Sequence, residues 1–170
     1  MLKRSFALSA IDIRQLGDQL EAKNCKNKID AALTKLDANP EDLKEFEVYI
    51  GYVITINEYE TYKEAIRRIA RLEVHNGNQA GFYYHSARCK FAYGKFLGTA
   101  AMGAFEEADW RFKSAIADLA KVGQKLASKD YVELANKLKN EVEAVIEPNI
   151  KLKDIAKEKF FEKHPRNKMR

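Results

Sequence analysis

The chain has 170 residues, of which 46% are hydrophobic and 32% charged, a balance typical of one globular domain and not of a disordered chain. Two cysteines exclude a disulfide framework, and three prolines with eight glycines are few for an all-β fold, so we expect a cytoplasmic α-helical protein with free thiols. The net charge of +5 resides in residues 151–170, because the first 150 residues are neutral overall. No stretch approaches the roughly 18 apolar residues of a transmembrane segment.

Helical spacing of apolar residues begins near the N-terminus. A stripe at i, i+3 and i+7 predicts a first helix near residues 7–23, and a second short stripe over 29–36 stops before Asn39 and Pro40. Asn39 has the side chain of an N-cap, and proline is favoured at the first helical position. We therefore expect the next helix to begin at Pro40.

Residues 46–56 fit two patterns. Alternate positions are apolar, as in a strand, but Phe46, Ile50 and Val53 also fit helical spacing. A strand needs a partner, and no second alternating run exists in the sequence. We interpret this segment as a helix.

The middle of the chain predicts further helices separated by glycine. Residues 59–74 form an amphipathic stripe that ends in the sequence HNGN, where Gly77 is suited to a left-handed C-terminal cap. Helix resumes through the aromatic residues 81–96, with an interruption expected at Gly94–Gly103. A further helix is predicted over 102–127.

The C-terminal part predicts two helices with a break between them. Ser128 is a suitable cap for the first of them, Glu147-Pro148 is expected to end it, and a final helix continues as far as His164-Pro165. The sum is an all-α, compact bundle of six to eight helices with short loops and a basic C-terminal helix. We expect one domain over 1–163 and a short basic tail over 164–170.

The stretch GFYYHSARCKFAYGKF, residues 81–96, is apolar on two opposed faces of a helix, which is typical of a helix buried between neighbours. His85 and Cys89 are one turn apart, but two ligands make only half of a zinc site, so we expect a core pair and neither metal nor cofactor. The alternative is a groove-lining helix that offers Tyr83, Arg88 or Lys95 to a ligand.

The helix over 59–74 carries a second candidate site. Arg68 and His75 share its polar face with Arg67 and Arg71, and the spacing Arg-x6-His resembles the motif of HEPN-type ribonucleases. The resemblance implies an all-α protein in which Arg68 holds a phosphate and His75 helps to activate a ribose 2′-hydroxyl. The alternative is a solvated face stabilised by ion pairs with Glu64.

Few other residues indicate chemistry, so the sequence favours a non-catalytic α-helical protein-interaction or regulatory module that binds a protein partner or forms a homo-oligomer. One alternative is a nucleic-acid-associated accessory protein that uses basic helix faces or the lysine-rich C-terminus, where Ile155, Phe160 and Phe161 interrupt the lysines. The other is a HEPN-like ribonuclease. The candidate binding residues are the cations Arg67, Arg71, Arg88, Lys95, Lys157 and Lys163.

Overall fold

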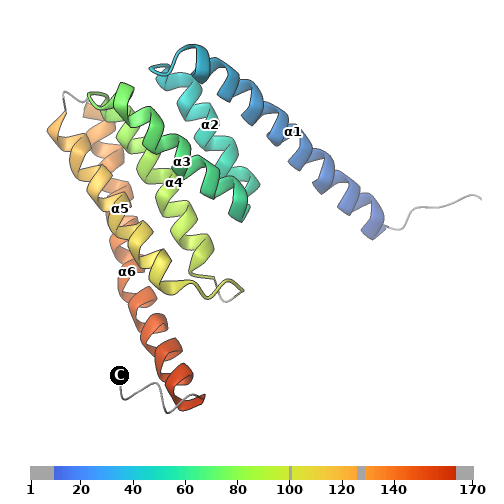
Figure 1. Ribbon diagram of the computed structural model, residues 1–170, viewed down its shortest axis with the longest axis vertical. Coiled ribbons are helices and arrows are strands. Elements are labelled where there is room, and N and C mark those ends of the chain that lie inside the picture. The colour runs from blue at the N-terminus through green and yellow to red at the C-terminus, as the bar shows by residue number, and fades with distance from the viewer. Residues whose placement is uncertain (1–9, 100, 126–128, 164–170) are drawn as a thin grey trace, which may run out of the picture.

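The computed structural model describes residues 10–99, 101–125 and 129–163, and side chains from residue 20 onward (Figure 1). These residues form six helices and no strand, which confirms the prediction of an all-α fold. The helices are α1 (Ala10–Ala38), α2 (Leu43–Ile56), α3 (Tyr59–Asn76), α4 (Ala80–Leu97), α5 (Phe105–Gln124) and α6 (Lys129–Lys163).

The aromatic helix α4 is the centre of the bundle and packs against α2, α3, α5 and α6. Its Phe82 ring stacks on Phe46 of α2 with centroids 4.7 Å apart, and Phe91 on the other side lies 6.0 Å from the Phe112 ring of α5. All four rings are buried, and each contributes about 1.5–3 kcal/mol by leaving water. The prediction of a helix buried on two opposed faces is therefore confirmed.

Helix α1 is one continuous helix of 29 residues, so the expectation of two separate helices over 7–23 and 29–36 was wrong. Residues 24–28 contain neither glycine nor proline, and nothing in this segment stops the helix. In the described part of the chain α1 packs its backbone against α2, touches α3 through the Asp37–Arg68 ion pair, and extends away from the bundle with its N-terminal part (Figure 1).

Helix α2 confirms the helical interpretation of residues 46–56, but its beginning differs from the prediction. The N-cap is Asp42, whose side chain accepts a hydrogen bond from the Glu45 amide at 3.1 Å. Asn39 and Pro40 lie in the preceding turn instead. The prediction was wrong because Asp42 offers the same capping oxygen three residues later.

Two glycines also behave differently from the prediction. Gly77 ends α3 with a right-handed φ of −58° and does not adopt the predicted left-handed cap. The backbone N–H of Gln79 closes the turn by donating to the Asn76 carbonyl at 2.9 Å. Helix α4 continues through Gly94 as far as Leu97. Gly94 serves close packing there, since a Cβ at this position would lie 2.5 Å from the Phe112 ring.

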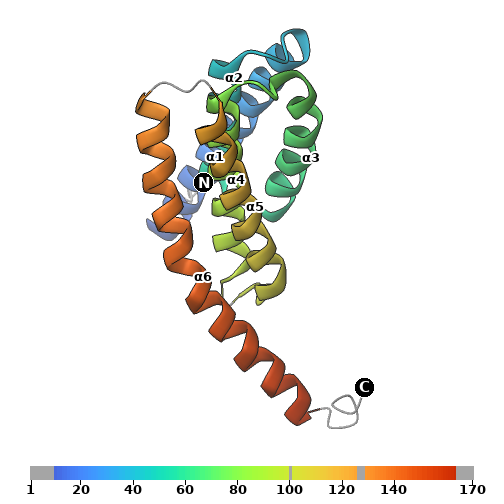
Figure 2. The ribbon, with the colours of Figure 1, turned by 90° about the vertical axis from the view of Figure 1, so that its left-hand side faces the viewer.

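Helix α6 runs unbroken over 35 residues with Pro148 inside it, so the predicted break at Glu147-Pro148 was wrong. A proline removes one helical hydrogen bond and crowds the preceding turn, which bends a helix without having to end it. Figure 2 shows α6 changing direction along its middle part. Asn149 ties the helix to the bundle just after the proline, donating to the Phe105 carbonyl at 3.0 Å. The Ser128 cap and the 164–170 tail lie outside the described residues.

Candidate functional site

A groove of about 640 Å³ lies between the beginning of α5 and the last turns of α6. One wall consists of residues 103–107, from the α4–α5 loop and the first turn of α5. The other wall is one face of α6, from Lys153 to Phe161. Phe105, Ala156 and Phe161 give the groove an apolar interior, and its size is that of pockets that hold ligands or side chains of a partner.

The groove exists because α6 is longer than the helices beside it. Figures 1 and 2 show the C-terminal part of α6 extending past the ends of α4 and α5. The face of α6 that carries Leu138 and Val142 is buried in the bundle and continues, at helical spacing, to Asn149 and Ala156. The bundle covers this face as far as Asn149, while Ala156 is exposed and lines the groove.

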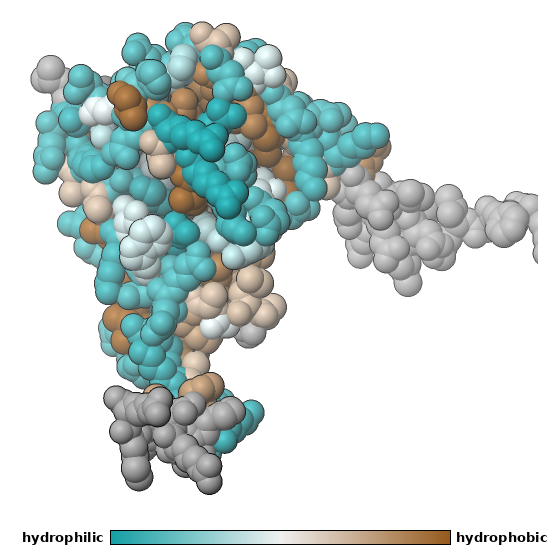
Figure 3. Space-filling view, viewed as in Figure 1, coloured by the Kyte–Doolittle hydropathy of each residue, from teal (hydrophilic) through white to brown (hydrophobic). Residues whose placement is uncertain are grey.

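Exposed apolar side chains concentrate at this end of the molecule. Of eleven large apolar side chains that are exposed in the described residues, five come from the α4–α5 loop and the second half of α6. Single exposed apolar residues are normal on a protein surface. Of these five, Phe160 lines the groove and the other four do not. Figure 3 shows an apolar area on this side of the molecule, above the end of α6. The five residues are Met102, Ile150, Leu152, Ile155 and Phe160.

Charged residues border the groove. Lys157 Nζ lies 2.9 Å from Glu106 Oε1 across it, and the hydrogen bond from Lys157 lowers the pKa of Glu106 and raises that of the lysine. Lys153 Nζ lies 3.9 Å from the buried carboxylate of Asp109. Both lysines approach the groove from α6, so the α6 edge is basic and the α5 edge acidic.

Arg88 and Lys95, predicted to share one edge of α4, have different surroundings. The Arg88 guanidinium donates to His85 Nδ1 at 3.1 Å and lies beside the Tyr84 ring. Lys95 is exposed, lies over the Phe91 ring at 4.5 Å and lines two shallow pockets of about 290 and 190 Å³. A groove is therefore open beside Lys95, between α4 and its neighbours.

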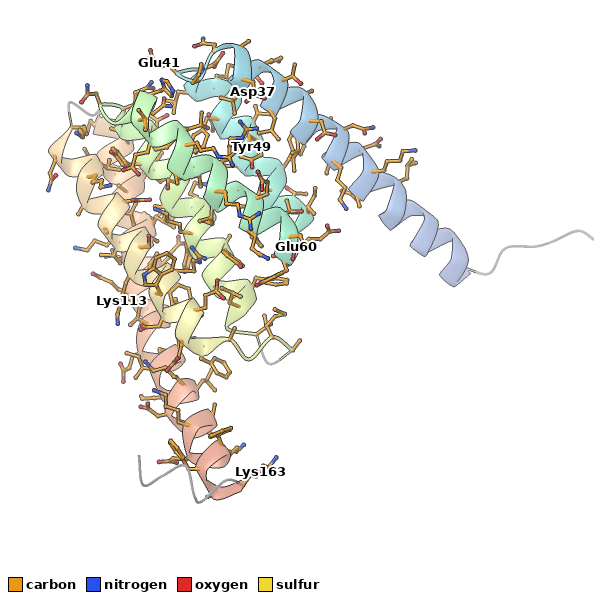
Figure 4. All side chains as sticks on the ribbon, in the orientation of Figure 1. Asp37, Glu41, Tyr49, Glu60, Lys113 and Lys163 are labelled. Atoms are coloured by element: carbon orange, nitrogen blue, oxygen red, sulfur yellow. The ribbon has the colours of Figure 1, made fainter. Side chains whose placement is uncertain are left out.

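The polar face of α3 is partly neutralised. Arg68 Nη1 bonds Asp37 of α1 at 2.6 Å, and Arg67 Nη1 lies 3.5 Å from Glu64. Figure 4 labels Asp37 at the end of α1, beside α3. Arg71 and His75 are exposed, and neither has an ion-pair partner within the described part of the chain. The structure thus ties Arg68 to a carboxylate and leaves His75 in solvent near the helix end.

His85 and Cys89 are buried in the core, as predicted. Burial, with a smaller contribution from the nearby Arg88 charge, lowers the pKa of His85 to about 4, and burial raises the pKa of the Cys89 thiol to about 12. His85 Nε2 has no hydrogen-bond partner in the described structure, and a carboxylate oxygen of Glu47 lies 4.0 Å from it. No group of three His, Cys, Asp or Glu side chains suited to a metal ion occurs in the described residues.

A buried polar cluster that the sequence did not predict joins α4 to α5. Asp118 Oδ2 accepts from Ser86 Oγ at 2.6 Å and from Lys90 Nζ at 2.5 Å. Nearby, Lys121 of α5 donates to Glu73 of α3 at 2.8 Å. The only sequence signal for this cluster is Asp118, a charged residue that helical spacing places on the buried face of α5. None of these side chains lines the groove or the pockets beside Lys95, so the cluster stabilises the packing of the three helices.

The chain has no match among the protein families, curated proteins or solved structures with which it was compared. In the part of the chain that the structure describes, no helix combines the length and the apolar character needed to cross a lipid bilayer. The groove between α5 and α6 is therefore the feature from which a function can be inferred.

Proposed function

We propose that the protein is a non-catalytic interaction module that binds another protein in the groove between α5 and α6. The observation that carries this proposal is the groove of about 640 Å³, whose lining includes the apolar side chains of Phe105, Ala156, Phe160 and Phe161. Burial of such side chains by a partner supplies most of the driving force of protein association, and polar residues at the rim set specificity.

One end of the groove is tied to the bundle. The buried Asn149 of α6 is hydrogen-bonded to the carbonyl of Phe105, the first residue of α5. Phe105 also lines the groove. Because this contact fixes where α6 leaves the bundle, less conformational entropy is lost when a partner binds at that end of the groove. This supports a docking role for the groove.

Two alanines on α6 provide a matched test. Ala156 lines the groove and Ala144 lies on an exposed part of the same helix, so Ala156→Arg fills the groove and Ala144→Arg leaves it open. A photo-crosslinking amino acid at Phe161 should capture a protein, which is identified, purified and bound again. We expect its affinity to fall at least tenfold with Ala156→Arg and to stay unchanged with Ala144→Arg. Equal affinities for the two variants would reject the groove as the binding site.

Binding of nucleic acid is the second candidate, favoured by Lys159 and Lys163. Both are exposed, and neither has an ion-pair partner among the residues described in α6 and its neighbours. Lysines of this kind bind phosphates without sequence preference and with strong salt dependence. Binding of a labelled oligonucleotide that weakens steeply between roughly 50 and 200 mM salt, about tenfold or more, would support this function.

The ribonuclease hypothesis has less support in the geometry. Arg68 is already bonded to Asp37, so a phosphate would have to displace that carboxylate before Arg68 could hold it. We expect no RNA cleavage by the purified protein. Cleavage that His75→Ala abolishes would revive this hypothesis.

A further inference from the structure

We infer that the groove between α5 and α6 binds an amphipathic helix whose apolar stripe is flanked by acidic side chains. This inference rests on the proposed docking function and adds the shape and charge of the partner segment. It is supported by the length of the groove, the chemistry of its interior and the distribution of charge around it.

The groove has the dimensions of a helix-binding site. Its α6 wall runs from Lys153 to Phe161, about two turns or roughly 12 Å of helix. Over that length a bound helix presents apolar side chains at i, i+3 or i+4, and i+7, the anchor spacing of helix-in-groove complexes. Apolar atoms of Phe105, Ala156 and Phe161 are available to these anchors.

The position of the groove also favours a helix. α6 continues past the ends of α4 and α5, so its inner face loses its helical neighbours where the groove begins (Figure 2). A helix laid here would pack on α6 as α5 does in the bundle. Helix packing of this type brings axes within about 8–10 Å of each other.

The charges around the groove select an acidic partner. The carboxylates of the α5 wall already have cationic partners on their own helix or across the groove. Glu107 bonds Arg111 at 3.0 Å, and Asp109 bonds Lys113 at 2.8 Å. On α6, in contrast, residues 151–163 contain five lysines and three acidic residues. Of these lysines, Lys153 and Lys157 line the groove, while Lys159 and Lys163 lie outside its lining and lack carboxylate partners in the described chain. The helix end that forms this wall therefore carries a net positive charge.

The pair of Lys157 and Glu106 makes this selection testable in both directions. Lys157 reaches 2.9 Å across the groove to Glu106, and both side chains are exposed. An acidic residue of the partner would compete with Glu106 for this ammonium group. Removing the charge of Glu106 should therefore strengthen binding of an acidic helix, whereas removing Lys157 should weaken it.

The probes are two designed helical peptides of about 16 residues that share one leucine stripe and differ only in having glutamate or lysine on both sides of it. Binding to the full-length protein is measured by fluorescence anisotropy. We expect the acidic peptide to bind at least tenfold more tightly than the basic one. Glu106→Gln should tighten its binding about two- to fivefold, and Lys153→Ala with Lys157→Ala should weaken it about tenfold.

Lys137, an exposed lysine of α6 outside the groove, is the matched control, and Lys137→Ala should change the affinity less than twofold. Circular dichroism of each variant confirms that the bundle remains folded. If the basic peptide binds as tightly and Ala156→Arg blocks both peptides, the docking function stands and the acidic partner is rejected. If neither peptide binds, or if Ala156→Arg leaves their binding unchanged, the docking function is rejected as well.

Two other occupants would also overturn the inference. A dimer of the purified protein that Ala156→Arg dissociates in light scattering would identify a second copy of the chain as the occupant. A single-stranded RNA that displaces the acidic peptide, and whose affinity falls with Lys153→Ala and Lys157→Ala, would identify the surface as one for nucleic acid.

Discussion

Replacing Gly94 with alanine tests the close packing of α4 against α5. The added Cβ would lie 2.5 Å from Cε1 and 2.8 Å from Cδ1 of Phe112, so this buried ring would have to move by about 1 Å. Phe91 lies beside that ring and restricts the movement. Overpacking of a core costs about 1–3 kcal/mol, and the better helix propensity of alanine returns about 1 kcal/mol. Because the ring has little room to move, we take the overpacking cost at about 3 kcal/mol and expect the free energy of unfolding to fall by about 2 kcal/mol.

Gly51, in the middle of α2, is the control, because a Cβ there meets no atom within 4 Å. Gly51→Ala should therefore stabilise the protein by about 1 kcal/mol through propensity alone. Thermal unfolding followed by circular dichroism should show Gly94→Ala melting about 4–8 °C lower than wild type and Gly51→Ala about 2–4 °C higher. Adding Phe112→Leu to Gly94→Ala should recover part of the loss. A Gly94→Ala variant as stable as Gly51→Ala would refute this packing.

Three further predictions concern buried groups. Because burial lowers the pKa of His85 to about 4 from about 6.5 in the unfolded chain, stability should fall as pH drops through this window, by about 2 kcal/mol between pH 7 and 5. Urea unfolding of His85→Gln should show a loss of unfolding free energy between pH 7 and 5 that is smaller by about 2 kcal/mol. Identical pH profiles for the variant and wild type would contradict the burial of a neutral His85. Asp118→Ala leaves the Lys90 ammonium without its carboxylate and should cost about 3 kcal/mol in urea unfolding, whereas a loss below about 1 kcal/mol would mean that the cluster contributes little. In a Cys25→Ala protein, Cys89 should react with a thiol reagent over a hundredfold more slowly than after denaturation, and equal rates would show that it is accessible.

The helical core could be predicted from the sequence because its signal is local. Apolar residues on two faces of α4 are enough to place that helix among neighbours, and the burial of His85 with Cys89 could be predicted from the same pattern. The failures came from features whose effect depends on tertiary contacts. Pro148 predicted a break, but the bundle holds both halves of α6 in one helix, with Asn149 anchored on α5.

The candidate site was only partly predictable for the same reason. Lys157 and Lys163 were expected on a basic C-terminal helix, and Lys157 does border the groove. The groove itself depends on where α5 begins relative to α6, which no periodicity in either helix encodes. Phe105 was expected only as part of a helix over 102–127 and became a groove residue through that register.

Backbone amide chemical shifts of the isotope-labelled protein, recorded during titration with the acidic helical peptide, test the central claim most directly. We predict that the largest changes fall in residues 103–107 and 153–161, the two walls of the groove. Changes centred instead on the α3 face around Arg67 and Arg71, or spread evenly along the chain, would contradict docking in the groove.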